Sequence, residues 1–206
     1  MPPFVWPTDP MKLVQNFEAR RQSPTAGALF AWAAFTLETL HYLDDIDSAF
    51  DHSHQPIGAH KPDIVDVAHS RWATGASVTA LDLCAAGLAR AFCQHRKDRE
   101  LDIGDFEPSS TTGRQKAAAR RAQLPTPALN WIDSVYADPR YATVKEARDW
   151  LTHSRVRRHI IGSAGGPPVR LELDLSARIS VRQLVEAARD LATRHVLAFF
   201  TILPQL

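Results

Sequence analysis

The chain has 206 residues, and 24 Lys and Arg nearly balance 23 Asp and Glu, which leaves a formal net charge of +1 at pH 7. This balance excludes the basic excess of a protein that coats duplex nucleic acid, so we expect any contact with nucleic acid to be local. The length suits one domain that buries its own core. We expect residues 1–206 to form a single, mainly α domain, a bundle of five to six helices with one small β-hairpin near 156–175.

The first half of the chain predicts three helices. Asp9-Pro10 supplies an N-cap followed by proline at the first helical position, which predicts a short helix to about residue 21. A long helix is expected over 24–51, and a third over 62–96, because apolar residues recur at helical spacing in both. Residues 52–62, with glycine and two prolines, predict the loop between them.

The helix expected at 24–51 should have an apolar side and an acidic side. Trp32 follows Leu29 at helical spacing, so we expect it on the apolar side that faces the core. The charged residues of this helix are all acidic, since no Lys or Arg occurs between residues 22 and 60. The pattern therefore predicts an acidic outer face.

One alternative for this face is a metal site. Glu38-x2-His41 has the i,i+3 spacing of di-iron carboxylate bundles, with Asp45 on the same face, and Asp66-x2-His69 repeats the spacing on the next helix. Such sites need two further carboxylates from other helices, and the sequence identifies none. We therefore assign no metal ligand and no cofactor, and keep a metal-binding carboxylate/His bundle as an alternative function.

The second half begins with a segment that has no clear period. Residues 97–124 mix charged, Ser/Thr and Gly positions, which predicts a flexible or partly disordered loop with a partial helix at 115–122. Helices should follow up to Asp138 and again after Pro139. The alternation of 169–175 predicts a strand that pairs with 156–162 as the hairpin, and a last helix runs from Ser180 to about residue 203.

The features that decide location point to the cytoplasm. Cys84 and Cys93 are the only cysteines, and on one helix they would lie about 13 Å apart along the axis, too far to bridge. The start has neither a basic nor an apolar signal region, and the longest apolar run, 26–37, is short for a membrane span. We expect a cytoplasmic protein with reduced thiols and no membrane segment.

Residues 141–159 concentrate basic residues and two histidines, and they contain the residues with recognisable site chemistry. As a helix, this stretch places Val144, Ala147, Trp150 and Leu151 on one side and Lys145, Asp149 and His153 on the other. Asp149 and His153 form an i,i+4 pair, so the carboxylate can hold one imidazole nitrogen and leave the other facing outward.

The spacing Arg148-x4-His153 also occurs as Arg90-x4-His95 and Arg189-x5-His195. In those two helices the apolar stripe continues onto the histidine, so we expect His95 and His195 to be interior or edge residues. His153 instead lies away from the apolar stripe. Three arginines follow it: Arg155, Arg157 and Arg158.

Arg148-x4-His153, with a polar residue directly after the arginine, resembles the Arg-x(4–6)-His motif of the HEPN superfamily. The resemblance implies a small all-helical protein, in many members a metal-independent ribonuclease, in which two protomers bring their motifs together. It implies catalytic roles for Arg148, Asp149 and His153 and substrate contacts for the three arginines that follow. Asparagine after the arginine is common in active members, so Asp149 is a departure that would repel phosphate unless neutralised.

The residue types fit metal-free cleavage of RNA, which needs a base near the 2′-OH, an acid for the leaving oxygen and a cation on the phosphate. One convincing histidine per chain implies two copies across a two-fold axis, hence a homodimer. The partners expected are RNA or a nucleotide, and a protein such as an antitoxin. The other alternative is a non-catalytic dimeric regulatory module that binds nucleic acid, a nucleotide or an acidic partner at its basic helix end.

Overall fold

The computed structural model describes residues 4–51, 61–93, 101–108, 114–153 and 181–206. In these residues it contains helices and no strand, so the mainly α prediction is confirmed, while the hairpin near 156–175 lies outside them. The described residues hold seven α-helices rather than five or six. They are α1 (Pro10–Arg21), α2 (Pro24–Asp51), α3 (Lys61–Phe92), α4 (Arg114–Arg121), α5 (Thr126–Ala137), α6 (Pro139–His153) and α7 (Val181–Ile202).

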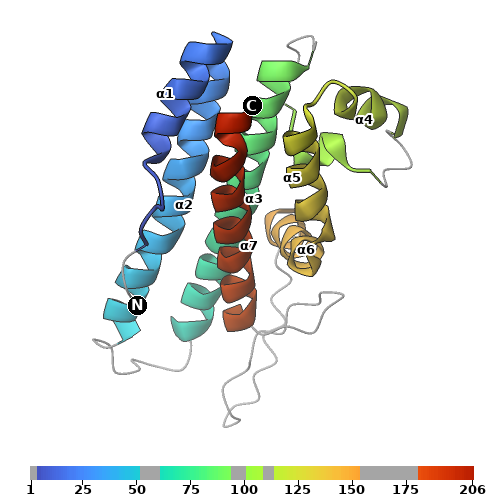
Figure 1. Cartoon of the computed structure of the whole chain (residues 1–206). Coiled ribbons are helices and arrows are strands. Elements are labelled where there is room, and N and C mark those ends of the chain that lie inside the picture. The colour runs from blue at the N-terminus through green and yellow to red at the C-terminus, as the bar shows by residue number, and fades with distance from the viewer. Residues whose placement is uncertain (1–3, 52–60, 94–100, 109–113, 154–180) are drawn as a thin grey trace.

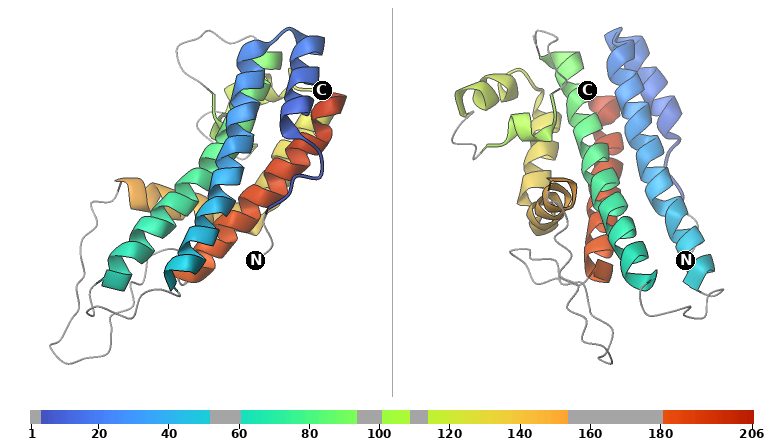
Figure 2. Two further views of the ribbon diagram at one scale, coloured as in Figure 1. Left: turned by 90° about the vertical axis from the view of Figure 1, so that its left-hand side faces the viewer. Right: turned by 180° about the vertical axis from the view of Figure 1, so that it is seen from behind.

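The long helices α2, α3 and α7 form the centre of the bundle, and α3 packs against both of the others. Helix α1 lies against α2 on one side of this layer, and α5 and α6 lie on the other side (Figure 1). The view from behind in Figure 2 gives the same order. Helices α2 and α6 therefore lie on opposite sides of α3.

The centre of the core is aromatic. Phe30 of α2 packs edge-on against Phe17 of α1 at 5.1 Å between ring centroids, and Phe199 of α7 lies 4.9 Å from Phe30. Gly87 of α3 lets Phe30 approach, because a Cβ at residue 87 would overlap the phenyl ring. This close contact sets the distance between α2 and α3.

The caps of α1 follow from its sequence. The Asp9 carboxylate accepts hydrogen bonds from the backbone N–H groups of Met11 and Lys12, as predicted for the N-cap before Pro10. At the other end Gln22 has a φ of 52°, and its N–H donates to the Glu18 carbonyl, which stops the helix.

The described parts of the 97–124 segment pack on the core instead of forming a structureless loop. Leu101, Ile103 and Phe106, around a short 3₁₀ turn η1 (Ile103–Phe106), are all buried. The helix expected at 115–122 is α4, and Arg120 ties it to Asp105 of the turn at 2.7 Å. Residues 97–100 and 109–113 lie outside the described residues.

Asp138, between α5 and α6, fixes the start of α6 on α7. Its carboxylate is the N-cap acceptor for the Arg140 N–H at 3.0 Å and also binds the Arg140 guanidinium at 2.8 Å. His195 of α7 contacts the same carboxylate through Nε2 at 3.1 Å. The Arg140 guanidinium holds the pKa of Asp138 below its ordinary value, so this buried group stays ionised.

One expectation for α2 is wrong. Trp32 does not face the core, because its side chain is 60% exposed. The buried positions of α2 between residues 26 and 40 supply the apolar stripe without it, and they are largely alanine, leucine and Phe30.

No helix in the part of the chain that the structure describes is both long and apolar enough to cross a membrane.

Candidate functional site

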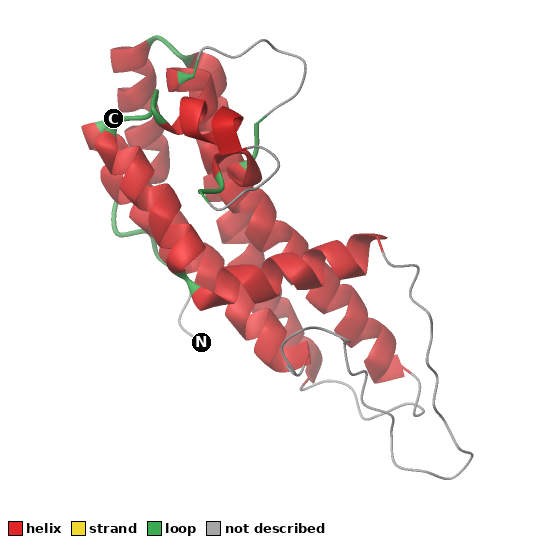
Figure 3. Ribbon diagram, turned by 90° about the vertical axis from the view of Figure 1, so that its right-hand side faces the viewer, coloured by secondary structure: helices red, strands yellow, loops and turns green. Residues whose placement is uncertain are grey.

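Helix α6 has the two faces that its sequence predicts. Val144, Ala147 and Leu151 are buried against the bundle, whereas the Lys145 and Asp149 side chains are 39% and 41% exposed. Trp150 is half-buried at the edge of the core. Figure 3 shows α6 lying across the long helices with its C-terminal end projecting past α3. The polar face is therefore presented to solvent on a helix that the core holds in place.

Asp149 is held by two cations on its own helix. The Arg148 Nε donates to Asp149 Oδ1 at 2.9 Å, and Arg148 Nη2 lies 2.8 Å from the same oxygen as an ion pair. The Lys145 Nζ lies 3.6 Å from Asp149 Oδ2. The sequence instead suggested that Asp149 holds His153. His153 is the last residue of α6 and its side chain lies outside the described part of the structure, so that pairing stays a prediction.

Asp82 of α3 is a further member of this group that the motif does not contain. Its Oδ2 lies 3.6 Å from Arg148 Nη1, and its Oδ1 accepts a hydrogen bond from the Ile103 N–H at 3.2 Å. Burial raises the pKa of Asp82 from 3.8 to about 6, and nearby Asp102 adds to the rise. We call Asp82, Lys145, Arg148 and Asp149 the α6 charge cluster.

The cluster changes charge close to neutral pH. With every group ionised its two cations and two carboxylates cancel, whereas protonation of Asp82 leaves one net positive charge beside Arg148. The sequence does carry a signal for Asp82, because it is the only charged residue of α3 between Arg71 and Arg90. What the sequence does not reveal is its neighbour in space, Arg148, which is 66 positions further along the chain.

The remaining motif residues divide between described and undescribed parts of the chain. His195 is buried at 4% exposure, as expected from its apolar stripe, and burial lowers its pKa. Its Nδ1 lies 3.4 Å from Ser134 Oγ, so both ring nitrogens have protein neighbours. His95, Arg155, Arg157 and Arg158 lie outside the residues that the structure describes.

Of the residues that the sequence suggests as metal ligands, Glu38 and His41 have described side chains, and both contact other protein groups. Glu38 accepts a hydrogen bond from the Trp6 indole at 2.7 Å, and His41 Nε2 lies 2.8 Å from Thr193 Oγ1. The Phe4 ring also stacks on the His41 ring at 4.4 Å. Across the described residues, no three His, Cys, Asp or Glu side chains are grouped as metal ligands would be. The side chains of Asp45, Asp66 and His69 lie outside them.

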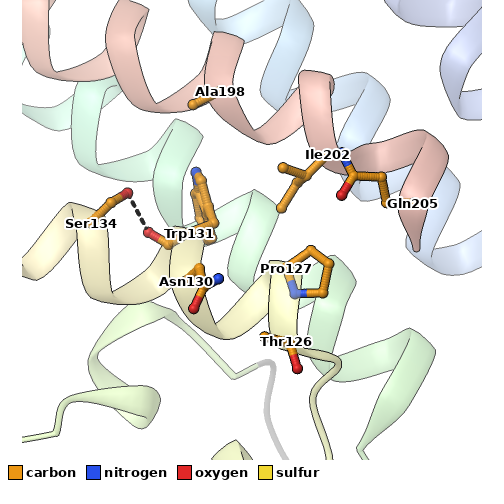
Figure 4. Close-up of a pocket in the computed structure, with 8 residues that line it drawn as sticks. All are labelled: Thr126, Pro127, Asn130, Trp131, Ser134, Ala198, Ile202 and Gln205. Carbon is orange, nitrogen blue, oxygen red and sulfur yellow. Dashed lines mark hydrogen bonds between the residues drawn. The ribbon is translucent and has the colours of Figure 1, made fainter.

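A shallow cavity of about 330 Å³ lies between α5 and the C-terminal end of α7 (Figure 4). The Trp131 ring and Ile202 give it an apolar wall, and the Ser134 hydroxyl donates to the Trp131 carbonyl at 2.7 Å. The cavity contains no residue of α6. It is therefore separate from the α6 charge cluster.

No family model, curated protein or solved structure matches the chain. The described residues form an all-α helical bundle with a half-buried arginine–aspartate pair on α6, the helix that ends at His153. The described cysteines of this bundle are both free thiols, Cys84 buried and Cys93 half-buried.

Proposed function

We propose that the protein is a HEPN-like, metal-independent endoribonuclease whose site is the C-terminal half of α6. Arg148 binds the phosphate, His153 acts as general base or acid, and Asp149 orients His153 or a substrate hydroxyl. The observation that carries the proposal is the compensation of Asp149 by Arg148 and Lys145 on the exposed face of α6. This compensation removes the objection that an aspartate after the arginine repels phosphate.

Arg148 is suited to phosphate because its guanidinium is a planar fork that can donate two parallel hydrogen bonds. It lies on a helix whose other face is buried, so its backbone position is fixed before substrate binds. Lys145 remains beside it, since the two cations share one carboxylate. When Arg148 turns from Asp149 to a phosphate, Lys145 still compensates the charge of the Asp149 carboxylate.

Asp82 controls how available Arg148 is. Above pH 6 the ionised carboxylate competes with a phosphate for the guanidinium, and below pH 6 the neutral acid competes less. A bound phosphate would in turn raise the pKa of Asp82, because two negative charges near one site repel each other. Substrate binding and protonation of Asp82 therefore favour each other.

RNA cleavage by this route starts with attack of the 2′-OH on the adjacent phosphorus. His153 removes the 2′-OH proton as base or donates a proton to the leaving 5′ oxygen as acid, and Arg148 stabilises the charge that grows on the phosphate. The product ends are a 2′,3′-cyclic phosphate and a 5′-OH. One His153 per chain supplies one of these two proton transfers, so a second copy of α6 across a two-fold axis supplies the other.

The competing function is a non-catalytic module that binds nucleic acid, a nucleotide or an acidic partner at the same helix end. The observation in its favour is that Arg148 already contacts two carboxylates, Asp149 and Asp82, as an arginine that only ties α6 to α3 would do. In that case the arginines after His153 carry the affinity and His153 does no chemistry.

The test is cleavage of single-stranded RNA by the full chain in the presence of EDTA, with analysis of the product ends. The wild type should give 2′,3′-cyclic phosphate ends, and His153→Ala should lower the rate by about a hundredfold or more with helicity unchanged. Asn16→Ala, an exposed polar position on α1, is the matched control and should keep full activity.

RNA that binds to the wild type but is not cleaved, with the same affinity for His153→Ala, would establish the non-catalytic module. Cleavage that EDTA abolishes would contradict the metal-independent mechanism.

A further inference from the structure

Helix α2 carries a second apolar stripe, on the side away from the core. Trp32, Phe35 and Tyr42 are 60%, 57% and 66% exposed, whereas Phe30 and Leu37 on the core side are fully buried. Trp32 and Phe35 pack edge to face at 5.6 Å between ring centroids. The three rings expose roughly 350 Å² of apolar surface, the size of the largest patch on a typical monomer, which is often an interaction site.

The stripe has the spacing of a coiled-coil seam. Ala28, Trp32, Phe35, Thr39 and Tyr42 follow one another at intervals of four, three, four and three residues. This 3.5-residue period keeps one line of side chains toward a neighbouring helix over several turns. The core-facing residues of α2 already pack on α1 and α3, so the second seam fits an additional helix.

The charges of α2 indicate which charged side chains the additional helix should carry. Residues 23–60 contain no Lys or Arg, while α2 carries five acidic residues, of which Glu38 and Asp45 fall at the positions that flank the seam. In a helix pair, charges that flank the apolar seam set the choice of partner. An acidic helix is complemented by one whose flanking positions are Lys or Arg.

A second copy of this chain fits the seam less well than a basic partner. Two α2 helices would bring only acidic groups together, with no cation between residues 23 and 60 to offset them. Helix α2 also lies on the opposite side of α3 and α7 from α6 (Figures 1 and 2). A two-fold axis through α6 therefore leaves the α2 seam exposed.

We propose that the outer seam of α2, formed by Trp32, Phe35, Thr39 and Tyr42, binds a basic amphipathic helix of another protein. The aromatic rings pack between the apolar residues of that helix, and the acidic groups of α2 pair with its lysines and arginines. The interaction is independent of the chemistry at α6, because the two surfaces share no residue.

The probe is a synthetic helix of about three heptads with Leu at the two seam positions and Lys or Arg at the flanking positions. A second peptide with Glu at the flanking positions is the matched ligand control. Fluorescence anisotropy with the full chain should show the basic peptide binding at least about tenfold tighter than the acidic one. Trp32→Ala and Phe35→Ala should each weaken the basic peptide by about tenfold or more.

Met11→Ala is the matched protein control, because Met11 is also an exposed large apolar residue but lies on α1. It should leave peptide binding unchanged. Equal binding of the two peptides, or binding of neither, overturns the proposal. So does a dimer that the double variant Trp32→Ala/Phe35→Ala converts to a monomer in sedimentation, because the occupant of the seam is then a second copy.

Discussion

At the scale of single residues, the contact between Asp82 and Arg148 links the proposed site to pH. The folded chain raises the pKa of Asp82 from 3.8 to about 6, so between these values the folded state binds more protons than the unfolded state. Stability from this group is full below pH 3.8 and is lost as the pH rises through 6. At neutral pH the ionised Asp82 therefore costs stability.

Asp82→Asn should remove this dependence, because an amide does not ionise and can still accept the hydrogen bond of the Ile103 N–H. The free energy of unfolding of the variant, relative to the wild type, should rise by on the order of 2 kcal/mol between pH 4 and pH 7. Urea unfolding at both pH values measures it. A difference that is the same at the two values would mean that Asp82 titrates in the folded chain as it does in the unfolded one.

At the scale of helices, the local periods gave the faces of α6 and the cap of α1, because both depend on residues a few positions apart. Two features of the structure could not be predicted from such local patterns. Leu101, Ile103 and Phe106 lie in a charged, irregular segment and become buried only because α3 and α4 pack against it. Asp82 and Arg148 meet only because α6 packs on α3. The outward turn of Trp32 likewise depends on which side of α2 the neighbours occupy.

Two glycines of α3 should respond to substitution in opposite directions. Gly87→Ala forces a methyl group into the Phe30 ring and should destabilise the fold by about 1–3 kcal/mol. Gly75→Ala meets no atom within 4 Å and should stabilise the helix by about 0.5–1 kcal/mol. Thermal unfolding followed by circular dichroism compares them. Equal effects at the two positions would show that the contact between Gly87 and Phe30 does not set the packing of α3 on α2.

At the scale of the whole molecule, the proposed site requires two chains with their α6 ends facing each other. Exposed Thr152 is next to His153, so Thr152→Cys in a Cys93→Ala background should form a disulfide between copies on mild oxidation. Ala19→Cys, at an exposed position of α1, should not. Non-reducing gels and sedimentation of the same samples give the result. A monomer at all concentrations, or equal cross-linking at the two positions, would rule out the two-fold site.

An RNA site on α6 is tested most directly by the affinity of single-stranded RNA for Arg148→Ala over a range of salt concentrations. If Arg148 is a phosphate contact, the variant should bind about tenfold more weakly, and the slope of log affinity against log salt should fall by about 0.7. Lys116→Ala, which removes an exposed cation from α4, should change neither quantity. Unchanged affinity and slope for Arg148→Ala would contradict the placement of an RNA site on α6.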